Sequence, residues 1–289
     1  MKQYLDSLQY ILDHGEIRSD RTGIGTISVF GMQTRYNLEK GFPAMTTKKL
    51  FFKGVVHELL WFLSGKTDIK YLLDNDINIW NDNAYDYYLK NNKEKINKEQ
   101  FIQAVKSGMI EGKLGPVYGQ QWRSWHINEY LKPIDQIQNV INSIKNNPDS
   151  RRHLVSAWCV DDIDSCALPP CHYSFQFYVS NSKLSCLFNM RSVDKFLGEP
   201  FNIASYAILT HMIAQICELE VGEVICSTGD SHIYNNHVEQ VKEQLKREPL
   251  PLPKLWLNPE IKNIDDFKYE DIKLIDYVSH SAIKGTMAV

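Results

Sequence analysis

The sequence predicts an α/β protein in which helices and strands share one domain. Some segments repeat apolar residues every three to four positions, as amphipathic helices do, and others alternate apolar and polar residues at the period of a strand. The chain has 289 residues, 43% of them hydrophobic, which suffices for one large core. It contains no internal repeat. We therefore expect a single domain over residues 1–289.

The N-terminal part predicts a helix, an extended segment and a buried helix. Apolar residues recur at helical spacing in 3–14, and residues 26–38 are typical of extended chain interrupted by Gly31. Residues 54–65 are apolar nearly all round, which indicates a buried helix. Glu58 lies inside it. Its carboxylate is either paired or functional, with a pKa raised by burial toward values useful for proton transfer, or it reaches solvent at the helix end.

The amino-acid composition changes in the middle of the chain. Residues 90–113 are rich in Lys, Asn and Glu, and Asn97 and Gln100 have the spacing of a helix capping box. We interpret this segment as a peripheral insertion within the domain. After it, residues 133–145 predict a helix and residues 153–160 a strand.

Cys171 follows two prolines at the start of a predicted strand. Pro169 and Pro170 each fix a φ angle, and the segment 173–180 places Tyr, Phe, Phe and Val at alternate positions. A free cysteine is by default a small buried hydrophobe. A rigid strand end is also a good place for a reactive group, so a structural and a nucleophilic Cys171 are both open at this point.

A second strand, 183–191, is predicted to pair with the first as a hairpin through the turn at 181–182. This pairing brings Arg191 toward Cys171, where a guanidinium favours the thiolate over the thiol. Met190 lies on the opposite face of the strand.

Two helices are predicted after the hairpin, an apolar one over 202–218 and a more polar one over 234–247. His232 and His237 are five residues apart, which is not a metal-binding pattern, and the sequence has no glycine-rich phosphate loop. We therefore expect no metal site.

Charge and arginine use limit the classes of ligand. With 32 basic and 35 acidic residues the net charge is −3, which argues against bulk attraction to nucleic acid or to an acidic membrane. An anionic ligand therefore needs a local basic cluster. Arginine is rare, and its planar fork either binds phosphate or carboxylate or forms surface ion pairs. The eight arginines are Arg18, Arg21, Arg35, Arg123, Arg151, Arg152, Arg191 and Arg247.

The cysteines and the first fifteen residues indicate the cellular compartment of the protein. The six cysteines are scattered with no C-x-x-C pair, and the first fifteen residues are amphipathic and acidic, unlike a secretion signal. No apolar run approaches the length of a membrane span. We expect a reduced, cytoplasmic protein.

Several motifs, in one order along the chain, resemble the thymidylate synthase family. The resemblance covers the whole chain apart from 90–113. The motifs are DRTG (20–23), ELLWFL (58–63), IW (79–80), LGPVYG (114–119), SRR (150–152), LPPCH (168–172), RS (191–192), FNIASY (201–206), GDSHIY (229–234), REP (247–249) and MAV (287–289).

The resemblance implies a homodimer built on a twisted mixed β-sheet flanked by helices, with the sheets packed across the dimer interface. It implies a methyltransferase that converts dUMP to dTMP with 5,10-methylenetetrahydrofolate as co-substrate and releases dihydrofolate, with no metal or nicotinamide. In this chemistry Cys171 adds to C6 of uracil, C5 then attacks the one-carbon unit, and hydride transfer completes the methyl group.

The resemblance also implies site residues. Those for dUMP are Arg21, Arg191, Ser192 and the partner subunit's Arg151 and Arg152 at the phosphate, Asn202 at the uracil amide, and His232 and Tyr234 at the ribose. Those for catalysis are Cys171, Glu58, Arg191, Asp194, Tyr118, His172 and Trp80. Those for folate are Asp194, Trp80, Ile79, Leu197, Phe201 and Ala288.

Five of these have implied roles around the reacting ring. Glu58 is the general acid and base acting through water, and His172 and Tyr118 form the network around the ring and its C5 proton. Trp80 flanks the exocyclic methylene. Asp194 contacts the pterin.

One departure from the family pattern bears on the product. Met190 stands where the family usually has glutamine, and a similar Asn-Met-Arg-Ser stretch occurs in the phage deoxycytidylate hydroxymethylase, where water captures the methylene. Asn202 favours uracil over cytosine as the base. The alternatives are therefore a deoxyuridylate hydroxymethylase and, from another class, a nucleotide- or RNA-binding protein without catalysis.

Overall fold

The computed structural model describes residues 1–126 and 132–286. A six-stranded sheet in these residues has the strand order β1-β2-β6-β5-β4-β3. Neighbouring strands are antiparallel except β5 and β6, which are parallel, so the predicted mixed α/β fold is confirmed. The strands are β1 (Glu16–Arg18), β2 (Thr26–Asn37), β3 (Leu154–Ser156), β4 (His172–Ser180), β5 (Lys183–Asp194) and β6 (Glu220–Tyr234).

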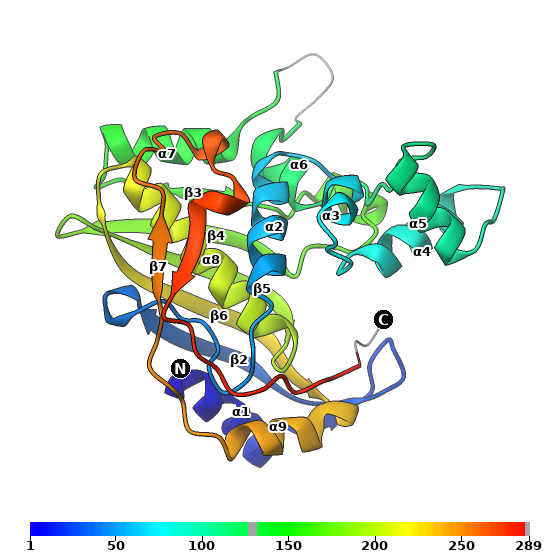
Figure 1. Cartoon of the computed structure of the whole chain (residues 1–289), viewed down its shortest axis with the longest axis horizontal. Coiled ribbons are helices and arrows are strands. Elements are labelled where there is room, and N and C mark those ends of the chain that lie inside the picture. Colours follow the sequence, from blue (N-terminus) through cyan, green and yellow to red (C-terminus); the bar gives the residue numbers. More distant parts are fainter. Residues whose placement is uncertain (127–131, 287–289) are drawn as a thin grey trace.

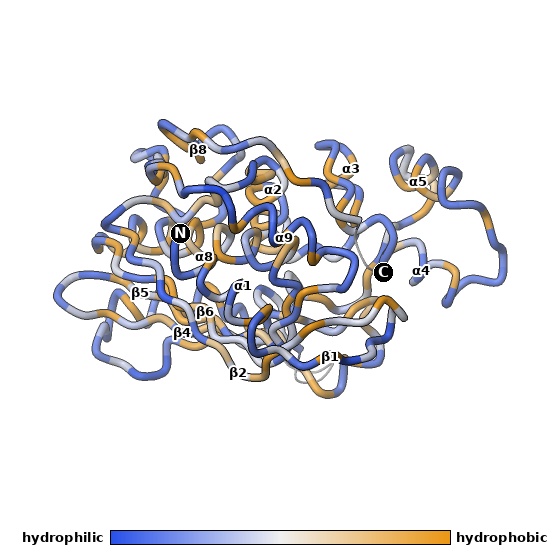
Figure 2. The backbone as a smooth tube through the Cα atoms, turned by 90° about the horizontal axis from the view of Figure 1, so that it is seen from below, coloured by the Kyte–Doolittle hydropathy of each residue, from blue (hydrophilic) through white to orange (hydrophobic). Residues whose placement is uncertain are grey.

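Helices pack over this sheet. The helix α8 (Gly198–Ile216) is buried on nearly all sides and contacts β5 and β6, and α2 (Phe52–Leu63) packs on α8 (Figure 1). In Figure 2 much of the hydrophobic colour lies in these inner elements. The other helices are α1 (Lys2–His14), α3 (Lys70–Asp74), α4 (Asn81–Asn91), α5 (Lys98–Ser107), α6 (Tyr118–Arg123), α7 (Gln136–Asn146) and α9 (Val238–Leu245).

A small second sheet completes the fold. It pairs β7 (Lys254–Leu257) with β8 (Ile272–Ile275), and β7 contacts α8. In residues 1–126 and 132–286, no helix is both long enough and apolar enough to cross a membrane.

The hairpin at 181–182 is confirmed. Asn181 and Ser182 have φ values of 50° and 59°, the left-handed backbone that a tight turn between β4 and β5 requires. Along β5, Met190 belongs to the buried face and Arg191 to the opposite, partly buried face. In β2, Gly31 has a φ of +85°, and the pairing with β6 is interrupted there, as the predicted break requires.

The strand β6 is the largest miss. The sequence was expected to form a helix from Tyr234, but Tyr234 is the last residue of β6, and α9 begins at Val238. Gly222 and Gly229 within β6 weaken the strand signal, because glycine has low strand propensity. Burial alternates along β6 around Val224, but Val224, Ile225 and Cys226 are all apolar, so the sequence shows no clean alternation.

Three other predicted boundaries were wrong. The helix predicted over 133–145 begins at Gln136, because the Asp135 side chain accepts a hydrogen bond from Gln138 N and caps it. The strand predicted over 153–160 is only β3, since a 3₁₀ turn starts at Val160. The apolar helix begins at Gly198 instead of residue 202, with a proline in its first turn.

The alternation predicted for 173–180 fails at Tyr173. A register shift between His172 and Ser174 leaves Tyr173 36% exposed, while His172 and Phe175 are buried. The bulge therefore turns His172 into the core beside Cys171.

Candidate active site

The sheet register brings the predicted motifs together. In the parallel pair β5 and β6, Asp194 lies opposite His232, and Ser192 lies opposite Asp230. In the antiparallel pair β2 and β6, Thr26 lies opposite Tyr234, so the loop that precedes β2 reaches the same edge.

Two adjoining cavities open at this edge, of about 370 and 290 Å³. The larger is lined mainly by charged and polar side chains, including Arg21, and the smaller mainly by apolar and aromatic ones, including Trp80. Five residues line both cavities: Leu168, Cys171, Ser192, Asp194 and Tyr234.

Arg191 is held against Cys171 by the two prolines. Its Nε donates to the Pro170 carbonyl at 2.9 Å and its Nη2 to the Pro169 carbonyl at 2.8 Å, while Nη2 lies 3.7 Å from Cys171 Sγ. The Arg191 N–H also donates to the Cys171 carbonyl, at 2.9 Å. The prolines therefore fix both the thiol and its arginine. The predicted proximity of Arg191 and Cys171 is confirmed.

The electrostatic balance at Cys171 differs from the expectation. Burial raises the pKa of the thiol, and Arg191 lowers it by less, so the pKa lies above its ordinary value. The guanidinium thus acts in the predicted direction but does not outweigh the loss of solvent.

Glu58 is buried, which excludes the solvent-reaching alternative. It is 7% exposed on α2, and one carboxylate oxygen accepts a hydrogen bond from Trp80 Nε1 at 2.7 Å. Burial raises the pKa of Glu58 to about 7, and the Trp80 hydrogen bond partly opposes this. Because the pKa is close to neutral pH, the carboxyl group can both give and take a proton.

His172 and Tyr118 form a stacked pair beside the thiol. Their ring centroids are 4.1 Å apart, and the Cys171 N–H donates to Tyr118 Oη at 2.8 Å. His172 Nδ1 lies 2.8 Å from Tyr206 Oη. Burial lowers the pKa of His172 to about 3, so the imidazole is neutral at physiological pH.

The loop carrying Arg21 is built around Asp20. The Asp20 carboxylate accepts hydrogen bonds from Thr22 N at 2.8 Å, Thr22 Oγ1 at 2.5 Å and Gly25 N at 2.7 Å. This turn places Arg21 in the wall of the polar cavity, which also contains Arg191.

His232 and Tyr234 stand at the end of β6. His232 Nδ1 lies 3.1 Å from Asp230 Oδ1, and the rings of His232 and Tyr234 meet edge to face, with centroids 5.0 Å apart. Asp230 therefore orients His232, a role that we did not predict.

The start of α8 supplies the apolar cavity. Asp194 Oδ1 accepts hydrogen bonds from Phe196 N at 2.8 Å and Leu197 N at 3.2 Å, which shapes the turn between β5 and α8. Leu197, Phe201 and Asn202 then line this cavity, with Ile79 and Trp80 on another side of it.

Met190 lines the same cavity, although it lies on the strand face opposite Arg191. It is 3% exposed and pairs with His172 across the β4–β5 ladder. It is therefore a wall of the site, and not a remote position. Sequence reasoning also missed other wall residues, which occupy ordinary apolar or turn positions: Leu168, Val193 and Gly198.

Some predicted residues are not brought to the site. Arg151 and Arg152 are exposed and line neither cavity. Ala288 lies outside the described residues. Other arginines form internal contacts: Arg123 pairs with Asp135 and Asp265. In residues 1–126 and 132–286, no group of three or more His, Cys, Asp or Glu side chains could hold a metal ion.

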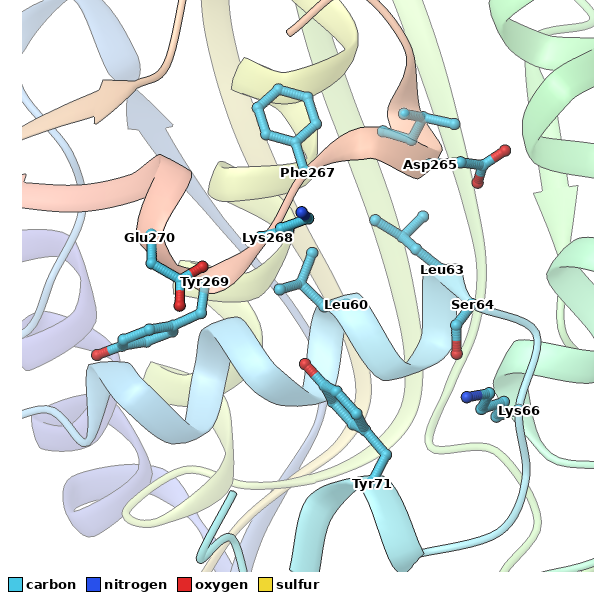
Figure 3. A pocket seen from close by; sticks show the side chains of 11 residues that line it. Leu60, Leu63, Ser64, Lys66, Tyr71, Asp265, Phe267, Lys268, Tyr269 and Glu270 are labelled. Atoms are coloured by element: carbon cyan, nitrogen blue, oxygen red, sulfur yellow. The ribbon is translucent and has the colours of Figure 1, made fainter. Parts of the chain in front are cut away.

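A third cavity, of about 360 Å³, lies along α2 and contains none of the predicted site residues (Figure 3). Its wall combines Leu60 and Leu63 of α2 with Tyr71 and the segment 264–270. Neither Glu58 nor Cys171 lines this cavity.

Comparison with known proteins agrees with this geometry. The family model described as thymidylate synthase matches residues 2–289. A thymidylate synthase of Mycoplasma mobile is 55% identical over 296 residues, which cover 100% of this chain and 100% of that protein. The chain belongs to the thymidylate synthase family.

Proposed function

We propose that the two cavities bind dUMP and 5,10-methylenetetrahydrofolate side by side, with Cys171 between them as the nucleophile. The family and the 55% identity make the chain a methyltransferase that forms dTMP from dUMP, with methylenetetrahydrofolate as its co-substrate. The observation that carries the residue assignment is that Cys171, Ser192, Asp194 and Tyr234 line both cavities.

The polar cavity suits the nucleotide. Arg21 and Arg191 offer planar forks to the doubly charged phosphate, with Ser192 as a further donor. His232 and Tyr234 offer polar groups to the ribose hydroxyl.

The apolar cavity suits the uracil ring and the folate. Asn202 can donate to and accept from the uracil amide. Asp194 provides an acceptor for the pterin, and Ile79, Leu197 and Phe201 cover aromatic rings.

The reaction then proceeds through covalent addition. Cys171 Sγ, as the thiolate, bonds to C6 of uracil, and the ring electrons shift to C5. C5 attacks the methylene carbon as the bond from that carbon to N10 of the folate breaks, while its bond to N5 remains. Glu58, acting through water, then removes the C5 proton, and the bond to N5 breaks, which releases tetrahydrofolate and leaves an exocyclic methylene beside Trp80. A hydride from tetrahydrofolate reduces this methylene as Cys171 leaves, which gives dTMP and dihydrofolate.

The family and the 55% identity support thymidylate as the product. Met190 and Val193 line the apolar cavity, so the departure at Met190 lies in the wall of the site. A deoxyuridylate hydroxymethylase would differ only in the last step, where water would capture the methylene, and product analysis distinguishes the two.

We infer a homodimer in which Arg151 and Arg152 of the partner subunit complete the phosphate site. Two strands of the large sheet expose apolar side chains that a monomer would leave in water: Phe30 of β2 is 84% exposed and Tyr178 of β4 is 64% exposed. Packing against a second copy of the chain would bury such side chains.

Mixing two inactive variants tests this dimer. Cys171→Ala loses the nucleophile, and Arg151→Ala with Arg152→Ala loses the partner's phosphate contacts. Random subunit exchange should give hybrids with one intact site of two, and so about a quarter of wild-type activity. Activity that stays at zero after exchange contradicts a shared site.

We also infer one domain over 1–289, with 90–113 as a peripheral insertion, and a cytoplasmic location. The apolar side chains buried in the described residues form one contiguous cluster. Helix α5 begins with the predicted Asn97–Gln100 capping box and contacts α3 and α4 at one side of the molecule (Figure 1). All six cysteines are free thiols, as suits a reducing compartment.

Thiol alkylation tests the central assignment. Iodoacetamide should modify Cys171, and saturating dUMP should protect it, because the nucleotide covers the thiol. Cys159, which is partly exposed and lines neither cavity, is the control and should react at the same rate with or without dUMP. Equal labelling of Cys171 with and without dUMP contradicts the proposal.

A further inference from the structure

A fully buried ion pair lies directly behind the active site. Lys195 and Glu199 are both 0% exposed, and Lys195 Nζ lies 2.5 Å from Glu199 Oε2. The two residues span the turn from the end of β5 to the start of α8, with Asp194 immediately before Lys195. A buried charge pair costs desolvation energy, and apolar residues would fill this space without that cost.

The pair is tied to two other elements. Tyr4 Oη of α1 donates to the Lys195 carbonyl at 2.7 Å, and the Lys195 N–H donates to the His232 carbonyl of β6 at 2.9 Å. Cys226 Sγ, also on β6, lies 3.7 Å from Glu199 Oε1. Side-chain and backbone contacts to α1 and β6 thus hold the turn that carries Asp194.

Several buried polar groups at and around the ion pair lack hydrogen-bond partners in residues 1–126 and 132–286. Apart from their mutual contact, Lys195 Nζ and Glu199 Oε2 have none, although an ammonium group has three protons to donate. The buried hydroxyls of Thr34 and Tyr36 have no hydrogen-bond partner in these residues other than each other. Burial and the charge of Glu199 raise the pKa of Tyr36 well above its ordinary range, which places Tyr36 in the same charged interior. Buried groups of this kind are normally satisfied by internal water.

We propose that Lys195 and Glu199, bridged by ordered water, form a positioning unit for the folate side of the active site. The unit holds the turn that presents Asp194 and Leu197, together with the first turn of α8, which ends at Phe201. The inference rests on the proposed assignment of these residues to the apolar cavity. Arg21 lies in the loop before β2, so its contact with the phosphate does not depend on the unit.

Charge removal tests whether the two residues act as a pair. Lys195→Met and Glu199→Leu each leave one buried charge without its partner, which should shift the turn and raise the KM for methylenetetrahydrofolate by at least about fivefold. The KM for dUMP should change less. The double variant has no buried charge left and should return the folate KM toward the wild-type value.

Two further variants complete the test. Lys2→Met with Asp6→Leu removes an exposed pair of the same i,i+4 spacing, 2.7 Å apart on α1, and should leave both KM values unchanged. Tyr4→Phe removes only the hydroxyl that donates to the Lys195 carbonyl. It therefore replaces Lys195→Met or Glu199→Leu in the test if either of these variants does not fold. It should raise the folate KM in the same direction by a smaller factor.

The outcomes separate this inference from the proposed function. Wild-type folate KM in the single variants, or in Tyr4→Phe if these do not fold, overturns the positioning unit, as does a double variant that is no better than either single one. Wild-type protein that forms no thymidylate would instead overturn the proposed function. A crystal structure with ordered water between Thr34, Tyr36 and the pair supports the unit, and a dry cluster contradicts it.

Discussion

The two cavities that meet at Cys171 differ in their lining, which is charged and polar in one and mainly apolar and aromatic in the other. The polar cavity concentrates charged groups such as Arg21 and Arg191 on loop and strand ends. The apolar cavity is walled by residues such as Trp80 and Phe201, and it buries Glu58 deeply enough to raise its pKa to about 7. In our account the first cavity binds an anion, and the second supplies a largely apolar environment for proton and hydride transfer.

Because of this contrast, substitutions in the two cavities should change different kinetic constants. Changes in the polar cavity should weaken nucleotide binding with a smaller effect on turnover. Changes in the apolar cavity should lower turnover or shift its pH dependence. We expect five effects of this contrast, from the largest to the smallest.

Glu58→Gln should lower kcat by about 10² to 10⁴-fold, because the amide cannot transfer the C5 proton. The KM for dUMP should change little, since Glu58 does not line the polar cavity. Steady-state kinetics with both substrates measures this. A variant with normal kcat would show that another group moves the proton.

The same substitution should stabilise the fold at high pH. The folded pKa of Glu58, about 7, lies above its usual 4.5, so its contribution to stability is fully present below 4.5 and is lost as the pH rises to 7. Glu58→Gln avoids this loss and should gain up to about 3 kcal/mol at about pH 8, with little gain at about pH 5. Urea unfolding at the two pH values and one protein concentration measures the difference. An equal effect at both pH values argues against a raised pKa.

Arg21→Ala should raise the KM for dUMP by about ten- to a hundredfold, because a hydrogen bond to a charged phosphate is lost. The kcat at saturating dUMP should fall much less. The matched control is Arg35→Ala, which removes an exposed arginine paired with Glu223 at 3.2 Å and should alter neither constant. A kcat that falls as far as kcat/KM would place Arg21 in the chemical step.

Trp80→Phe should move the pH profile of kcat upward. The Trp80 hydrogen bond lowers the pKa of Glu58, so its removal raises that pKa above about 7, and the basic form appears only at higher pH. Trp256→Phe, at a site 39% exposed, is the control and should leave the profile in place. A downward shift would contradict the assigned sign.

Met190→Gln should have the smallest effect. The substitution restores the residue usual in the family at a position that forms only part of the wall, so we expect kcat/KM to change by less than about threefold, with thymidylate still the product. Product analysis by mass spectrometry checks this. Hydroxymethyl nucleotide from the wild type that disappears in Met190→Gln would show that Met190 controls water entry.

Several features of the site could be predicted because they follow from local pattern. The hairpin at 181–182 fixes the register of Arg191 against Cys171. The apolar helix around Glu58 made burial one of two alternatives, and the structure decides for burial. Motif resemblance supplied the remaining site residues, and most of these line the two cavities.

Other features depend on tertiary contacts that no local pattern contains. The carbonyls of Pro169 and Pro170 bind Arg191 through the backbone, so side-chain identity does not reveal them. Met190 faces a cavity that exists only after α8 and the β4 bulge are in place. The central strand β6 was missed because its glycines and its consecutive apolar residues hide the period-two burial pattern.

The central claim is that Cys171 directs a reductive methylation in the shared part of the two cavities. The most direct measurement is the mass of the nucleotide formed from dUMP and methylenetetrahydrofolate, with dihydrofolate followed in the same tube and Cys171→Ala as the blank. We predict thymidylate and dihydrofolate in equal amounts from the wild type, and neither from the variant. A hydroxymethyl nucleotide with no dihydrofolate, or thymidylate from Cys171→Ala, would contradict the account.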